Sequence, residues 1–167
     1  MEAMQKITPF LWFDKQAEEA MNFYTSIFPD SKIVSIKKYP AGIEEGPMKG
    51  MDGKVLTGVF ELMGQKFMAL DGGPYFKPTG AVSQYVECET QEEVDRYWEK
   101  LTEGGDPQAQ QCGWLQDKYG FSWQIIPKLL PQLLADPDKE KSGRVMQAMM
   151  QMKKIESSVL QKAYDGE

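Results

Sequence analysis

The pattern of apolar residues in the first half of the chain predicts a strand, a helix and three more strands. Residues 7–13 are apolar and aromatic, which favours a strand, and Asp14 offers a side-chain oxygen to cap a following helix. Helical spacing puts six apolar residues on one face: Ala17, Ala20, Met21, Tyr24, Ile27 and Phe28. The further strands are predicted at 32–39, 54–63 and 66–70. The Gly- and Pro-rich segment 40–53 is typical of a long loop that borders a site.

The same order of elements begins again after the Gly-rich turn at residues 71–74. A strand is predicted at 82–88, and Thr90 and Glu93 form a capping box that opens a second helix. Its buried face consists of Val94, Tyr97, Trp98 and Leu101. Three strands are then predicted around 109–114, 115–119 and 121–126. Parts of the two helices also match at an offset of 74 positions, which indicates two tandem βαβββ units.

The last forty or so residues are predicted to be helical. Leu129, Leu130, Leu133 and Leu134 form a short apolar stripe. Asp136 and Pro137 cap and start a longer helix, and Ser157 or Ser158 caps a last one. This segment is too apolar to float free, so we expect it to pack on the body or on a partner subunit. The predicted organisation is a domain at 1–127, with units 5–74 and 80–127, and a helical extension at 128–167.

Composition narrows the class of partner. The 167 residues are 41% hydrophobic, which suits one domain with a real core. The net charge is −6 and the basic residues are scattered, which argues against nucleic acid and against anionic membrane surfaces. Neither a membrane-spanning stretch nor an apolar signal core is present, so we expect a cytoplasmic protein.

The chain contains no histidine, which removes the commonest metal ligand and the usual near-neutral acid-base group. Cys88 and Cys112 match no zinc or redox spacing, so we expect free thiols. Cys112 is a possible nucleophile, but a structural cysteine is the preferred interpretation because no histidine is present to activate the thiol. The methionines at 146, 149, 150 and 152 have the helical spacing of a packing face.

Several strings resemble the PhnB-like family of the glyoxalase-like, or vicinal-oxygen-chelate, superfamily. They are Thr8-Pro-Phe-Leu-Trp-Phe13, Ala20-Met-Asn-Phe-Tyr24, Leu70-Asp-Gly-Gly-Pro74, Gln111-Cys-Gly-Trp-Leu115 and Trp123-Gln-Ile-Ile-Pro127. The resemblance implies an α+β fold in which two tandem βαβββ units form a cupped mixed sheet around a small-molecule cavity, followed here by a C-terminal helical tail. Relatives are sometimes labelled demethylubiquinone methyltransferases. Gly72 and Gly73 lead into Pro74 instead of a helix, however, so no nucleotide-binding turn supports that label.

The superfamily often holds a divalent metal on His and Glu side chains from four strands. By the resemblance these positions fall at Pro9 (or Thr8), Met68, Ser83 and Gln124. Such residues do not suit a divalent ion, which prefers carboxylate or imidazole. We therefore expect no metal and no other cofactor.

Strand alternation predicts which side chains line the cavity. The predicted ligand-binding set is Leu11, Phe13, Met68, Leu70, Ser83, Tyr85, Glu87 and Gln124, with Ser122 and Ile126 on the same side. The alternative is that the polar members only hydrogen-bond one another. Glu87 and Tyr85 are the candidates for catalysis. Burial in an apolar cup would raise the pKa of Glu87, and the alternative is that Glu87 lies at the strand end in water. Among the tryptophans, Trp12, Trp98 and Trp123 are assigned to the core, and Trp114 is left open.

The favoured function is a metal-free small-molecule-binding protein of unknown ligand. The alternative is a metal-independent isomerase or lyase that acts on a small polar metabolite through Glu87 or Tyr85. A third possibility is a purely structural dimer partner with a filled cup. In each case we expect a homodimer, since the apolar tail needs cover.

Overall fold

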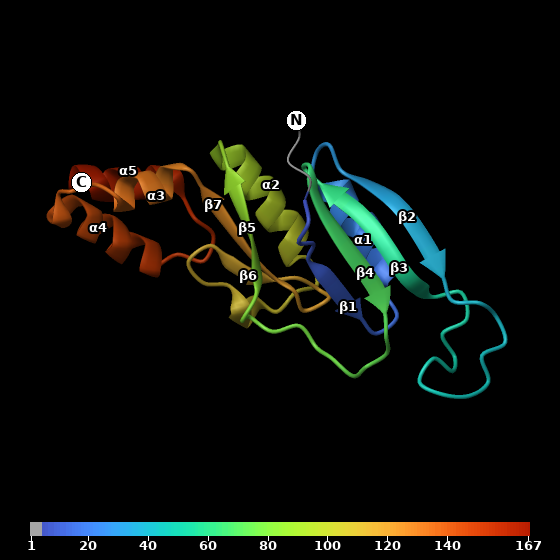
Figure 1. Ribbon diagram of the computed structural model, residues 1–167. Coiled ribbons are helices and arrows are strands. Elements are labelled where there is room, and N and C mark those ends of the chain that lie inside the picture. Colours follow the sequence, from blue (N-terminus) through green and yellow to red (C-terminus); the bar gives the residue numbers. More distant parts are fainter. Residues whose placement is uncertain (1–4) are drawn as a thin grey trace. The chain divides into compact units, whose positions relative to one another are not determined.

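The computed structural model describes residues 5–167, so the first four residues of the predicted domain lie outside it. The chain forms two compact units that meet in sequence between Lys77 and Pro78. Each unit combines one mixed β-sheet with helices (Figure 1), which confirms the α+β class. The segment 128–167, called the tail below, belongs to unit 2.

Unit 1 has the predicted βαβββ order. Its elements are β1 (Phe10–Phe13), α1 (Ala17–Ile27), β2 (Lys32–Lys38), β3 (Val55–Leu62) and β4 (Gln65–Asp71). The sheet order is β1-β4-β3-β2, with β1 parallel to β4 and the other neighbours antiparallel. All six predicted face residues at the first helix are buried, and Tyr24 stacks on Phe60 of β3. The helical periodicity therefore identified the core face of α1 correctly.

The cap of α1 comes from a distant residue and not from Asp14. The Ala17 N–H at the start of the helix donates to the carboxylate of Asp71, over 2.8 Å. The second oxygen of that carboxylate accepts the Val55 N–H at the start of β3, also over 2.8 Å. Asp71 is 1% exposed, whereas Asp14 lies on the surface. The prediction of Asp14 as the cap was wrong because tertiary contact brings a better acceptor to the same N–H group.

Unit 2 contains a smaller sheet. Its first elements are β5 (Ser83–Cys88), α2 (Gln91–Thr102), the 3-10 helix η1 (Pro107–Ala109), β6 (Trp114–Gln116) and β7 (Ser122–Pro127). The order is β5-β7-β6, with β5 parallel and β6 antiparallel to β7. The predicted cap is confirmed, because the Thr90 hydroxyl accepts the Glu93 N–H. The Glu93 carboxylate in turn accepts the Glu89 N–H.

The strand predicted around 109–114 does not form. Residues 107–109 are a 3-10 turn that starts at Pro107, and Gln111 makes only an isolated bridge to Trp114. Cys112 and Gly113 both have positive φ, 50° and 83°, which ends any extended run there. The second unit therefore has one strand fewer than predicted.

The tail packs on the body of unit 2. Its helices are α3 (Leu129–Leu134), α4 (Lys139–Met150) and α5 (Ser157–Asp165). Together with Ile126 of β7 they bury a second core of Leu130, Leu133, Val145, Met152, Ile155 and Leu160. Asp138 caps α4 in place of the predicted Asp136. The predicted serine cap of α5 does not form, because the N-cap position is Glu156 and the Ser157 N–H donates to the side chain of Gln91.

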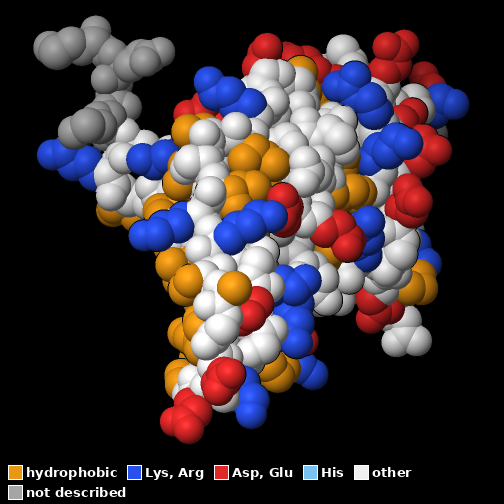
Figure 2. All heavy atoms as spheres, turned by 90° about the vertical axis from the view of Figure 1, so that its right-hand side faces the viewer, with side chains coloured by type: hydrophobic (Ala, Val, Ile, Leu, Met, Phe, Trp, Pro, Cys, Tyr) orange, Lys and Arg blue, Asp and Glu red, His pale blue; other side chains and the backbone are white. Residues whose placement is uncertain are grey.

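Surface charges of both signs are interspersed on one face of the described residues. On the face shown in Figure 2, Lys and Arg side chains lie among Asp and Glu side chains and form no single basic patch. Among residues 5–167 no helix is long and apolar enough to cross a membrane.

Candidate ligand site on the sheet of unit 2

The open face of the unit 2 sheet carries the predicted polar groups. The parallel register pairs Ser83 with Ser122, Tyr85 with Gln124 and Glu87 with Ile126, so these six side chains share one face. Trp114 pairs with Gln124 across β6 and β7 and joins the same face. The opposite face, with Leu115, Trp123 and Ile125, is buried and packs against α2. The predicted facing of this half of the site is therefore correct.

One polar pair on this face is already bonded. The Gln124 side-chain N–H donates to the Ser83 hydroxyl over 2.9 Å. This bond fixes two predicted positions relative to each other and leaves the Gln124 side-chain oxygen as an acceptor. The sequence-based alternative, that the polar residues bond one another, holds for this pair.

A hollow of about 250 Å³ lies on the open face and is called the unit 2 hollow below. It is lined by Tyr85, Cys112, Trp114, Gln124, Ile126, Leu130, Pro131, Leu134 and Met149. Three of these, Tyr85, Gln124 and Ile126, were predicted from the sequence. Trp114 was the one tryptophan left open, and Cys112 was assigned a structural role. The contribution of the tail was missed, because the apolar stripe of α3 was interpreted only as a packing face.

The two catalytic candidates differ in surroundings. Partial burial raises the pKa of the Tyr85 phenol, and the nearby Glu87 carboxylate raises it further. The phenol therefore keeps its proton at neutral pH and acts as a hydrogen-bond donor. The Glu87 side chain is 54% exposed and lies 3.6 Å from the Lys128 ammonium. Of the two settings that the sequence leaves open for Glu87, the structure shows the exposed one, because this carboxylate lies in water beside a counter-charge.

In unit 1 the predicted facing was wrong for the first strand. The register pairs Phe10 with Met68 and Trp12 with Leu70, so these four side chains share the open face. Leu11 and Phe13 point the other way, toward α1, and Phe13 is 4% exposed. Trp12 was assigned to the core, yet its indole lies on the open face against Gly72 and donates to the Gly73 carbonyl over 2.9 Å.

The cause of this error is a difference of one residue between the units. Three residues, 14–16, join β1 to α1, whereas only 89 and 90 join β5 to α2. An offset derived from the helices therefore shifts the first strand by one position, which moves every side chain to the opposite face. The correct alternation puts Thr8 on the side of Met68, and Pro9 on the side of Leu11.

The residues at the family's metal positions do not suit a divalent ion. Met68 offers a thioether, Pro9 no side-chain donor, and Thr8 a neutral hydroxyl. Ser83 and Gln124 offer only neutral oxygens, and the Ser83 hydroxyl already accepts the Gln124 side-chain N–H. Among residues 5–167 no group of three or more His, Cys, Asp or Glu side chains gathers at a metal-binding distance. These positions therefore lack the carboxylate and imidazole ligands that a divalent metal site requires.

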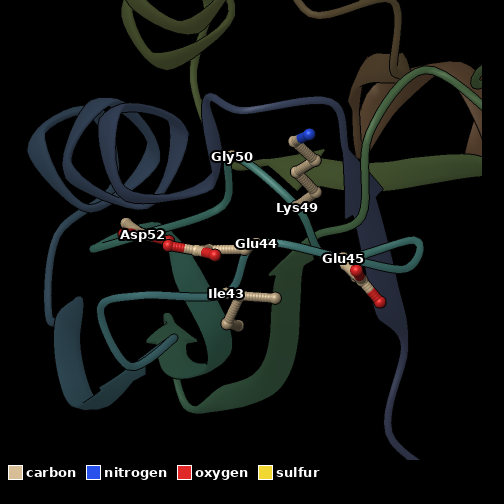
Figure 3. A pocket seen from close by; sticks show the side chains of 6 residues that line it. All are labelled: Ile43, Glu44, Glu45, Lys49, Gly50 and Asp52. Atoms are coloured by element: carbon tan, nitrogen blue, oxygen red, sulfur yellow. The ribbon is translucent and has the colours of Figure 1, made fainter.

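A second hollow, of about 570 Å³, lies along the loop 40–53 that the sequence singled out. Figure 3 shows that the side chains of Lys49 and Glu45 point in different directions, so this ammonium and this carboxylate do not converge on one point. Met51 and Tyr39 anchor the loop by burial, and the Tyr39 hydroxyl donates to the Asp71 carbonyl over 2.9 Å. This loop hollow lacks the converging polar groups of a binding site.

Comparison with known families settles the relationship. The family model described as 3-demethylubiquinone-9 3-methyltransferase matches residues 5–126. The chain belongs to this family. A PhnB protein of the family from Bacillus cereus is 47% identical, with 74% of this chain and 99% of that chain covered and a TM-score of 0.63. The predicted membership of the PhnB-like family is thereby confirmed.

Two further solved structures extend the comparison. A protein from Staphylococcus aureus is 34% identical over 73% of this chain and 95% of that chain, with a TM-score of 0.34. Protein PA1353 from Pseudomonas aeruginosa is 21% identical over 74% and 98%, with a TM-score of 0.59, which shows a shared fold. No match was found among the curated proteins. The family match ends at residue 126, so this PhnB-like chain carries its tail in addition to the part it shares with the family.

Proposed function

We propose that this chain is a metal-free small-molecule-binding protein whose ligand occupies the unit 2 hollow. The observation that carries the proposal is the hollow itself, which combines apolar walls with a few polar groups in the way of small-ligand sites. Tyr85 and Gln124 would orient the ligand, and Ser83 would act through its bond to Gln124. Met68 and Leu70 lie on the open face of unit 1 and do not line this hollow.

The activity in the family name finds no support in the geometry. A nucleotide cofactor is usually held where a strand leads through a Gly-rich turn into the N-terminus of a helix. After β4, residues 72–82 form neither helix nor strand before β5 begins. We therefore do not extend methyl transfer to this chain.

Catalysis without metal is the weaker candidate. An isomerase or lyase of this kind needs a group that accepts a proton beside the ligand. Tyr85 holds its proton because its pKa is raised, and Glu87 pairs with Lys128 away from the lining of the hollow. These surroundings favour binding over proton transfer.

A homodimer is also part of the proposal. Several apolar side chains of the described residues are exposed on open strand faces or beside them, among them Phe10 at 48% and Val82 at 71%. Surface of this kind marks protein interfaces, and a second copy of the chain would cover it symmetrically.

Binding is tested with a fragment screen by ligand-observed NMR, together with native mass spectrometry for co-purified molecules. We expect Gln124→Ala to weaken binding of a fragment found with the wild type by about fivefold to tenfold, the effect of one lost hydrogen bond. Gln84→Ala is the matched control, because Gln84 lies on the same strand as Ser83 but points to the opposite face. Equal affinities in the two variants, with both folded, would contradict the proposed site.

The metal-free part of the proposal has its own test. Elemental analysis of protein purified without chelator or metal affinity resin is expected to show no stoichiometric divalent ion. Nickel, zinc, manganese and magnesium are expected to leave the thermal midpoint unchanged, since an ion that binds only the folded state must raise it. One bound ion per chain, or a metal-induced shift abolished by Gln124→Ala, would overturn this part.

A further inference from the structure

The unit 2 hollow has two walls of different origin. The sheet and its adjoining turn supply one wall, formed by Tyr85, Cys112, Trp114, Gln124 and Ile126. The tail supplies the other wall, formed by Leu130, Pro131 and Leu134 at α3 and by Met149 of α4. The tail wall is entirely apolar, so the hydrogen-bonding groups of the hollow lie on the opposite side.

Direct bonds to the body hold the tail wall in place. The N–H groups of Cys112 and Gly113 donate to the carbonyls of Met152 and Lys153, over 2.8 and 2.7 Å. The Gln111 side chain donates to the Met150 carbonyl over 2.8 Å. On the other side of the tail, Gln91 donates to the Ile155 carbonyl over 2.9 Å. The hollow is therefore preformed, and a ligand gains affinity without first ordering its outer wall.

The lining chemistry specifies the class of molecule. Within the described part of the chain no charged side chain lines the hollow, so an ionised ligand would lose hydration without gaining a counter-charge. Tyr85 offers a phenol O–H and Trp114 an indole N–H, and neither makes a hydrogen bond within residues 5–167. Both groups donate, so they match an acceptor such as a carbonyl oxygen. The volume of about 250 Å³ is below that of sites for drug-sized ligands.

From these features we propose that the hollow takes a neutral, fragment-sized molecule whose carbonyl-type oxygen meets the sheet and whose apolar body lies on the tail. The tail then sets the size and shape of the ligand. The tail residues that would set this specificity lie outside the family match, which ends at residue 126. The inference rests on the proposed function and adds to it the ligand class and the role of the tail.

The test uses three probes of similar size and one larger probe with the full chain. Acetophenone is neutral with a carbonyl acceptor, benzoate is an anion, and ethylbenzene lacks the acceptor. 2-Acetonaphthone has the same acceptor on a larger body. Dissociation constants come from ligand-observed NMR. We expect acetophenone to bind wild type about tenfold or more tighter than benzoate or ethylbenzene, which corresponds to about 1.4 kcal/mol.

Shortening the side chains of the tail wall should enlarge the hollow and change which probe it prefers. Leu134→Ala and Met149→Ala are each expected to shift the ratio of affinities toward 2-acetonaphthone by about tenfold. Met150→Ala is the matched control on the same helix as Met149, because Met150 is 57% exposed and does not line the hollow. Unfolding curves establish that each variant is folded. If one of the two tail variants does not fold, the other still tests the inference.

Cys112 reports the position of the bound probe. It lines the hollow and is partly exposed, whereas Cys88 is fully buried and its burial raises the pKa of the thiol to about 12. Iodoacetamide should therefore label Cys112 selectively near neutral pH, and bound acetophenone should slow that reaction. One outcome separates the tail inference from the proposed function. Acetophenone would bind and Gln124→Ala would weaken that binding, but the tail variants would show the same ratio of affinities as Met150→Ala. The tail inference would then be wrong, and the proposed function would stand.

The remaining outcomes are equally decisive. Benzoate binding as tight as that of acetophenone would overturn the neutral ligand class. Acetophenone binding without protection of Cys112 would place the ligand elsewhere and overturn the tail inference. If no probe binds, the tail inference falls, and if the fragment screen finds no binder as well, the proposed function falls with it.

Discussion

Replacing Asp71 with alanine is expected to lower the free energy of unfolding by about 3 to 5 kcal/mol. The carboxylate accepts two buried backbone N–H groups, those of Ala17 and Val55, and it is 1% exposed. Alanine would leave both donors unpaired at the start of α1 and at the start of β3. Bonds to a charged acceptor contribute more than neutral ones, which makes the double loss large. Urea unfolding followed by far-UV circular dichroism measures the change.

Two further variants define the cause. Asp14→Ala is expected to change the free energy of unfolding by less than about 0.5 kcal/mol, because Asp14 is exposed and its side chain does not cap α1. Asp71→Asn should have a smaller effect than Asp71→Ala, since the amide keeps one oxygen acceptor. An Asp14 variant less stable than Asp71→Ala would show that the local cap governs the helix.

Gly113→Ala is expected to destabilise the chain by about 2 to 5 kcal/mol. Gly113 has φ of 83°, a conformation that alanine adopts only with strain. An added Cβ would lie 2.6 Å from the Ile126 side chain and 3.1 Å from that of Ile155. The Ile125 carbonyl oxygen, at 3.2 Å, blocks a simple shift of the new methyl group. Thermal and chemical unfolding of the two proteins measures the loss.

Gly143→Ala is the matched control and should act in the opposite direction. Gly143 lies within α4, and an added Cβ there meets no atom within 4 Å. Alanine favours a helix interior over glycine, so a gain of about 0.5 to 1 kcal/mol is expected. A stable Gly113→Ala protein would mean that the turn and the tail can separate at little cost, contrary to the contacts described.

Local rules of sequence determined much of the fold. The spacing of Ala20, Met21 and Tyr24 identified the buried face of α1, because a helix buries one stripe whatever surrounds it. Thr90 and Glu93 identified the start of α2, since the partners of a capping box lie within one turn. Alternation along β5 and β7 also placed Ser83, Tyr85 and Gln124 on one face.

What the tertiary structure decided involves contacts between residues far apart in the chain. Asp71 replaced Asp14 at the start of α1 because chain folding brought it there. The facing of Leu11 and Phe13 depended on one extra residue between β1 and α1. In a strand, a shift of one residue moves each side chain to the opposite face. The tail could be predicted as apolar, but its place beside Trp114 and Gln124 depends on hydrogen bonds from residues 111–113. Sequence thus determined the faces of α1, β5 and β7, and only the folded chain determined the facing of β1 and which faces meet to form the hollow.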